Sequence, residues 1–149
     1  MIQFICHKLL KNANMKYFLI LLTVLFFAGN SRAQTAEDSV KAVISKMFTA
    51  MKNADGAMLQ SCFSDSIIFQ TIGRNKEGQL VVRTEKAAGF VNQVSQATPG
   101  SYDERISFDV VRIDGPLAIA WTPYRFYLNG KFSHCGVNSF QLIRFNGEW

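Results

Sequence analysis

Apolar side chains recur at intervals of three and four residues between positions 36 and 52, a spacing that places them along one face of a helix. Residues 53–56 interrupt this pattern, and Asp55 is a suitable N-cap for a second, shorter helix that reaches residue 63. The chain therefore begins its fold with two predicted helices, whose apolar positions are Val40, Val43, Ile44, Met47, Phe48, Met51, Met58, Leu59, Cys62 and Phe63.

The middle of the chain predicts two short strands and a third helix. Residues 67–72 and 80–83 are rich in β-branched and aromatic side chains, and a polar loop at 73–79 separates them. Thr84 is a candidate N-cap for the helix, which ends before the Thr-Pro-Gly-Ser turn at 98–101.

The last third of the chain has the pattern of antiparallel strands. Apolar and polar residues alternate from Ile106, and a turn follows at 114–116. Two long runs, 117–128 and 131–145, flank Asn129-Gly130, which is a strong hairpin signal. Early helices and late antiparallel strands predict an α+β fold, with three helices on one face of a curved antiparallel sheet.

The predicted hairpin sorts its side chains onto two faces. A two-residue turn pairs Leu128 with Lys131 and, counting outward, Arg125 with His134. One face is then bulky with a few polar groups, the usual lining of a small-molecule pocket. We expect it to pack under the helices, with candidate ligand-binding residues Trp121, Arg125, Tyr127, His134, Asn138 and Phe140. The alternative is that these polar groups are structural and that Arg125 reaches solvent.

The adjacent His134 and Cys135 suggest a catalytic dyad or a metal site, but strand geometry opposes both. Neighbouring residues of a strand point to opposite faces, whereas a nucleophile and its base must lie within about 2.6–3.2 Å of each other. The same geometry prevents the pair from sharing one metal ion, and no other His, Cys or carboxylate cluster has zinc-ligand spacing. We expect neither a dyad nor a metal site.

The first 33 residues have the anatomy of an export signal. Met15-Lys16 precedes an uncharged apolar run at 17–28, and Ser31 and Ala33 occupy the −3 and −1 positions of a cut before Gln34. The run is shorter than the about 20 residues that span a bilayer. We expect a start at Met15, a periplasmic or secreted product without a membrane anchor, and one domain over residues 34–149.

The formal net charge of +5 arises mainly from that leader. Four of the 16 basic residues lie in it, which leaves 12 basic and 11 acidic residues; the four are Lys8, Lys11, Lys16 and Arg32. The remainder is nearly neutral and has no Lys/Arg cluster, so nucleic acid is not an expected partner.

Two stretches resemble the nuclear transport factor 2-like superfamily, in its SnoaL-like and lumazine-binding-like branch. VKAVISKMFTAMKNADGAMLQSCFSDSIIF is similar to its opening helices and its entry to the first strand, including Phe63-Ser64-Asp65. AIAWTPYRFYLNGKFSHCGVNSFQLIRFNGEW is similar to its closing strands, which end in Gly147-Glu148-Trp149. The resemblance supports the fold more strongly than any function.

The resemblance implies a cone-shaped, cystatin-like α+β fold with a pocket between the sheet and the helices. It also implies a further strand after Trp149, which this sequence lacks, and often a homodimer through the outer sheet face. Under the predicted register that face is rich in small residues, and we expect the contact to include Ala120, Thr122, Val137 and Ser139.

Enzymes of the superfamily use an Asp or His base and a polarising group in the pocket. Under the predicted register no carboxylate shares the face of Trp121, which leaves His134 as the candidate catalytic base, with Tyr127 or Arg125 as partner. The leading hypothesis is an exported, non-enzymatic protein that binds a small, partly apolar molecule without a cofactor. The alternatives are a cofactor-independent isomerase, dehydratase or cyclase using His134, and a protein–protein role through the outer face.

Overall fold

The computed structural model describes residues 35–149, and the predicted export signal lies outside the described residues. Helices precede long antiparallel strands, as the sequence predicts. The elements are α2 (Ala36–Lys52), α3 (Gly56–Gln60), β1 (Phe69–Arg74), β2 (Leu80–Glu85), α4 (Ala87–Ser95), β3 (Tyr102–Ile106), β4 (Val110–Asp114), β5 (Leu117–Leu128) and β6 (Lys131–Ile143).

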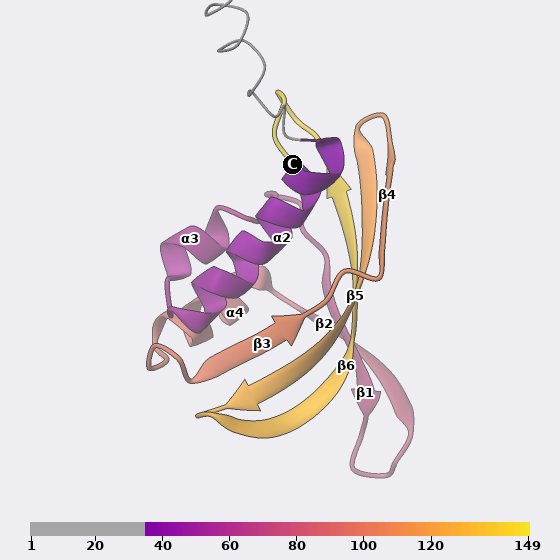
Figure 1. The fold of residues 1–149 in the computed structure, drawn as a ribbon. Helices are drawn as coiled ribbons and strands as arrows, with labels where there is room; N and C mark the ends of the chain where they lie inside the picture. Colours follow the sequence, from indigo (N-terminus) through magenta and orange to yellow (C-terminus); the bar gives the residue numbers. More distant parts are fainter. Residues whose placement is uncertain (1–34) are drawn as a thin grey trace, which may run out of the picture. The chain divides into compact units, whose positions relative to one another are not determined.

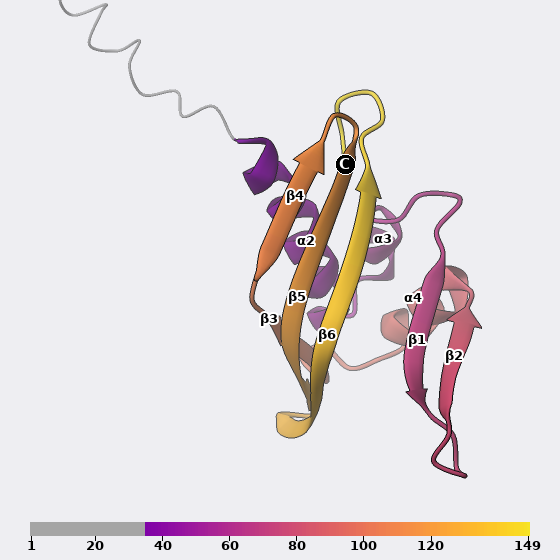
Figure 2. The same ribbon diagram turned by 90° about the vertical axis from the view of Figure 1, so that its right-hand side faces the viewer.

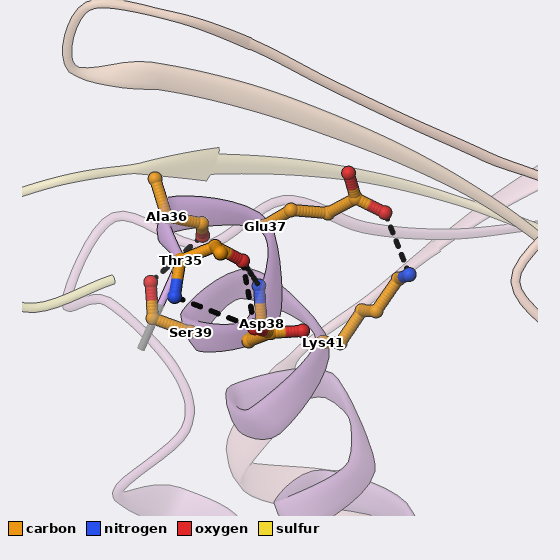
Figure 3. A network of polar contacts seen from close by, with 6 residues as sticks. All are labelled: Thr35, Ala36, Glu37, Asp38, Ser39 and Lys41. Carbon is orange, nitrogen blue, oxygen red and sulfur yellow. Dashed lines mark hydrogen bonds and ion pairs between the residues drawn. The ribbon is translucent and has the colours of Figure 1, made fainter. Parts of the chain in front are cut away.

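Helix α2 begins at a reciprocal cap, drawn in Figure 3. The Thr35 hydroxyl accepts a hydrogen bond from the Asp38 backbone N–H at 3.1 Å, and the Asp38 carboxylate accepts one from the Thr35 N–H at 3.3 Å. Each bond satisfies a backbone or side-chain group that the first turn would otherwise leave unpaired. Glu37 and Lys41 add an ion pair at 2.6 Å one turn apart on the surface.

The two shorter helices differ from the prediction at their ends. Asp55 caps α3 as expected, because its carboxylate accepts a hydrogen bond from the Met58 N–H at 2.8 Å. However, α3 ends at Gln60, so Cys62 lies beyond it rather than on its apolar face. The proposed cap Thr84 belongs to β2, and α4 begins after Lys86 without a side-chain cap.

Strand β5 is the centre of a four-stranded sheet. It pairs with β6 along one edge, while β4 and β3 follow each other along its other edge. The turn between β5 and β6 has positive φ at both Asn129 (51°) and Gly130 (75°), which the right-handed twist of a hairpin favours. Strands β1 and β2 form a separate two-stranded ribbon, seen beside the larger sheet in Figure 2.

The three helices lie on one side of the larger sheet (Figure 1). The core between them combines the apolar stripe of α2 with small residues of β5, and it consists of Val40, Ile44, Phe48, Ala50, Met51, Leu59, Val94, Ala118 and Ala120. The Trp149 indole packs against this core and donates a hydrogen bond to the Ser39 hydroxyl at 3.1 Å. Among residues 35–149, no helix is long and apolar enough to cross a membrane.

Candidate functional site

A β-bulge changes the register of the central hairpin. Leu128 pairs with Lys131 and Tyr127 with Phe132, as predicted, but the next pair is Phe126 with His134. Ser133 is therefore an extra residue on β6, without a partner of its own on β5. Because side chains alternate with a period of two, this single residue reverses the face of β6 relative to β5 from His134 onward.

The bulge separates the six predicted binding residues into two groups. His134, Asn138 and Phe140 lie on the inner face of the sheet, toward the helices, whereas Trp121, Arg125 and Tyr127 lie on the outer face. The inner face is carried by Ala118, Ala120, Thr122, Tyr124 and Phe126 of β5 and by His134, Gly136, Asn138, Phe140 and Leu142 of β6. The predicted pairing of Arg125 with His134 is wrong for the same reason, since Arg125 lies opposite Cys135.

The predicted residues of the outer sheet face are also wrong in part. Ala120 and Thr122, expected in a dimer contact, are buried on the inner face at 2% and 0% exposure. Val137 and Ser139 do lie outside, and Trp121, expected in the pocket, lies with them and is 46% exposed. The outer face is therefore more apolar than the sequence predicts.

The prediction that His134 and Cys135 do not form a dyad is confirmed. His134 faces inward opposite Phe126, and Cys135 faces outward opposite Arg125. Cys135 and Cys62 are both free thiols. Within residues 35–149, no group of three or more His, Cys, Asp or Glu side chains is placed to hold a metal ion.

The structure reveals a carboxylate on the inner face that the sequence prediction overlooked. Glu104 of β3 pairs with Phe126 of β5, so its side chain shares the face of His134. It accepts a hydrogen bond from the Asn138 side-chain amide at 2.7 Å. This bond connects β3 to β6 across β5, which lies between them.

Aromatic rings lie on the same face of the sheet as this hydrogen bond. The His134 ring lies 5.1 Å from the Phe126 ring and 5.8 Å from the Tyr124 ring, centroid to centroid. Tyr124 can extend over β6 because Gly136 lies opposite it. A Cβ atom at Gly136 would come within 2.7 Å of the Tyr124 hydroxyl oxygen. We call Glu104, Tyr124, Phe126, His134 and Asn138 the Glu104 cluster.

Burial perturbs the two acidic groups of the cluster in the same direction. Burial raises the pKa of Glu104, although the Asn138 hydrogen bond and the nearby His134 oppose the rise. Burial also raises the pKa of the Tyr124 phenol, and the electrostatic effects of Glu104 and Cys135 add to that rise. A raised pKa makes a carboxylate a stronger base than an ordinary glutamate, which is one way that active sites adapt a group to proton transfer.

Thr122 adds a polar group beneath the cluster. It is fully buried opposite Asn138, and its hydroxyl has no hydrogen-bond partner among residues 35–149. An unpaired buried hydroxyl costs about 1–3 kcal/mol.

The alternating pattern, when it is extended toward the N-terminus, predicts that Glu104 lies on the inner face. The predicted alternation begins at Ile106, whereas the observed strand begins at Tyr102. Extending the alternation of Ile106 and Phe108 backward by one step places Glu104 on the same face. The bulge at Ser133, in contrast, has no signal of its own in the sequence.

The depression at the hairpin turn is separate from the Glu104 cluster. It is an open hollow of about 370 Å³, and none of the six predicted binding residues lines it; its lining is Leu128, Asn129, Lys131, Phe132 and Ser133. Its walls carry no acidic group, so we place the candidate site at the Glu104 cluster.

Comparison with known proteins identifies the fold. No family model matches the sequence, and no curated protein matches it. A cystatin-like domain of unknown function from Nostoc punctiforme superimposes with a TM-score of 0.59 at 21% identity, covering 78% of this chain and 74% of that one. A proposed dehydratase of the NTF2-like family from Streptomyces avermitilis superimposes with a TM-score of 0.54 at 12% identity, covering 76% and 88%. A single-residue variant of a Mycobacterium tuberculosis protein of unknown function, Rv3472, gives 0.53 at 14%, covering 74% and 64%.

The chain has the NTF2-like, cystatin-like fold. The α+β architecture and the superfamily resemblance expected from the sequence are thus confirmed at the level of the fold. This fold supports ligand binding and enzymes alike, so the function must be argued from the side chains of the site.

Proposed function

We propose that the protein binds a small, partly apolar molecule at the Glu104 cluster. The hydrogen bond between Glu104 and Asn138 carries this proposal, because it fixes two polar groups on the inner face of the sheet. Phe126, Tyr124 and His134 supply apolar and aromatic surface beside them. A few convergent polar groups in an apolar wall are the usual features of a small-molecule site.

The burial of Glu104 supports a ligand-binding role. Within residues 35–149, the only side-chain hydrogen bond of the Glu104 carboxylate is the one from Asn138, which reaches Oε1. Burying a carboxylate is costly unless its oxygens are paired, so a ligand group that reaches Oε2 would gain a strong interaction.

A thermal-shift screen of small amines, alcohols, aromatic acids and sterols tests this function. A compound that binds should raise the Tm of the wild type and much less that of Asn138→Leu, which keeps the side-chain bulk but removes the amide. Glu77→Gln, a change in an exposed loop away from the cluster, should behave as the wild type. Equal shifts in all three proteins for every active compound would refute binding at the cluster.

Acid–base catalysis is the second candidate function. His134 is the expected general base only if the inner face carries no carboxylate. Because Glu104 lies on that face, it is a second candidate for the base. The raised pKa of Glu104, with Tyr124 and His134 nearby, favours a proton-transfer pair in a cofactor-independent isomerase, dehydratase or cyclase.

Two variants separate the possible bases. If Glu104 transfers the proton, Glu104→Gln should lower kcat by at least about 100-fold, the usual contribution of general acid–base catalysis, and His134→Gln should retain most activity. The reverse pattern would make His134 the base. Full turnover in both variants would exclude acid–base catalysis by this cluster.

The location and assembly of the protein are also part of the proposal. The leader pattern at residues 1–33 supports export, and a mature product that begins at Gln34 on N-terminal sequencing would test it.

The outer face supports a homodimer, because it exposes a row of large apolar side chains, namely Leu117, Ile119, Trp121, Val137 and Ile143.

A further inference from the structure

Glu104 is a carboxyl group in aromatic surroundings. Its strand partner Phe126 lies directly opposite, at the short cross-strand separation of about 4.5–5.5 Å between Cβ atoms. The Phe126 ring is flanked by the Tyr102 ring at 6.0 Å and by the His134 ring at 5.1 Å, centroid to centroid. Tyr124 is close enough for the charge of Glu104 to raise its pKa.

No lysine or arginine of the described chain pairs with this carboxylate. The ion pairs within residues 35–149 join Lys41 to Glu37 and both Lys52 and Arg105 to Asp103. Arg105 and Arg125 of the neighbouring strands lie on the outer face, where Arg105 stacks over the Tyr127 ring at 4.2 Å. The inner face therefore presents a carboxyl group without a lysine or arginine partner among residues 35–149, and the basic group that acts on it is the nearby His134.

A half-buried carboxylate and the electron-rich faces of aromatic rings both attract a positive charge. A hydrated metal ion would gain little from the rings, and an anion would be repelled by Glu104. An organic cation satisfies both features, because its charge meets the carboxylate while its alkyl groups contact the rings.

We propose that the Glu104 cluster selects a small organic cation, an alkylammonium or quaternary ammonium group, which contacts the Glu104 carboxylate and the rings of Tyr124 and Phe126. This inference rests on the proposed ligand-binding function and adds the chemical class of the ligand. Asn138 holds Oε1 of the carboxylate in place, and Oε2 faces the cation.

Choline and its neutral isostere 3,3-dimethylbutan-1-ol provide the test, since they have nearly the same shape and differ in charge. Binding is measured by NMR titration of the full chain at pH 8, far above the ordinary glutamate pKa of about 4.3. Choline should bind about tenfold or more tightly than the alcohol. In Glu104→Gln this preference should disappear, and in the control Glu77→Gln it should persist.

Phe126→Leu provides a second variant in case Glu104→Gln does not fold. It keeps an apolar side chain but removes the π system, so the preference for choline should fall several-fold while the alcohol binds as before. Equal binding of choline and the alcohol, with both weakened by Asn138→Leu, would overturn the cation inference and leave the ligand-binding function standing. Binding of neither compound, or an undiminished preference for choline in both cluster variants, would also overturn it.

Discussion

Two opposing influences act on the pKa of the Glu104 carboxyl group. Its burial favours the neutral acid, whereas the amide of Asn138 and the nearby His134 favour the carboxylate. Burial is the larger effect, so the pKa lies above that of a free glutamate. The group is consequently sensitive to whatever enters the inner face, because a ligand changes both its solvation and its charge environment.

The pH dependence of stability should carry a contribution from Glu104 with a defined sign. Because its pKa is raised on folding, the native state binds more protons than the unfolded state between the usual glutamate pKa of about 4.3 and the raised value. The free energy of unfolding should therefore fall as the pH rises through this window, by at most roughly 1.4 kcal/mol per pH unit. Glu104→Gln should lack this fall and still accept the Asn138 hydrogen bond.

Urea denaturation of both proteins between pH 4 and pH 8 measures the difference. The groups that act on Glu104 are Asn138, His134 and Tyr124, and all three are unchanged in the variant. If the wild type becomes more stable relative to Glu104→Gln as the pH rises, the assigned direction of the pKa shift is wrong.

Gly136 is required by the position of the Tyr124 ring. A methyl group at this position would lie 2.7–2.9 Å from the Tyr124 ring and hydroxyl, closer than side-chain atoms approach one another. Gly136→Ala should therefore displace the ring and lower the free energy of unfolding by about 1–3 kcal/mol. Gly89→Ala in α4 has open space around it, and thermal melts should show a stability equal to or above that of the wild type. Equal melting of the two variants would argue against the close contact.

The two free thiols of the described chain should differ in reactivity. Burial raises the pKa of Cys62, whose thiol also donates to the Met58 carbonyl at 3.3 Å, while Cys135 is exposed on the outer face. A raised pKa leaves less thiolate at pH 8, so iodoacetamide should label Cys135 first. Peptide mapping by mass spectrometry gives the two rates, which should converge in urea. Faster labelling of Cys62 would contradict the burial seen here.

At the scale of single elements, the long strands and α2 could be predicted because each has an uninterrupted pattern. The spacing of Val40, Ile44 and Phe48 is sufficient to define a helix face, and Asn129-Gly130 is sufficient to define the hairpin turn. The start of α4 could not be predicted, because the suitable cap residue Thr84 is used within β2 instead. Tertiary pairing here overrides a local preference.

Ser133 should be dispensable for the choice of β6 side chains that face the core. Because Ser133 has no partner on β5, its deletion leaves Tyr127 paired with Phe132 and Phe126 with His134, so Phe140 and Leu142 still face inward. The deletion variant should therefore fold, and it should melt within a few degrees of Ser133→Ala, which keeps the chain length, by circular dichroism. A deletion variant that fails to fold would show that the bulge itself is required.

At the scale of the whole domain, the two sheet faces have different chemistry. The inner face covers the core and carries the Glu104 cluster, while the outer face exposes aliphatic and aromatic side chains between charged ones. The division of the candidate site residues could not be predicted, because it depends on the register of two strands and one unpaired residue reverses it. Glu104 was within reach of prediction, because its strand alternates regularly from Tyr102.

The outer face leads to a prediction about assembly. If it forms a homodimer contact, multi-angle light scattering should give a dimer mass at high protein concentration. Trp121→Lys should weaken dimerisation by about 30-fold or more, as expected when a central interface tryptophan is lost. Ile72→Lys on the separate β1–β2 ribbon is the matched control, since Ile72 is also exposed but lies outside this face. A wild type that stays monomeric at millimolar concentration would exclude the contact.

The bulge at Ser133 has a consequence for the divergence of related genes. Point substitutions can change the side chains of the inner face only one position at a time, because each residue keeps its orientation. A change of register that places Ser133 opposite Phe126 would instead exchange the whole inward set of β6, bringing Cys135, Val137 and Ser139 beneath the helices. Loss of the Ser133 codon would leave the inward set unchanged, because Ser133 has no partner on β5. In homologous genes, a one-residue length difference between the turn and Gly136 should therefore be found with the same inward side chains of β6.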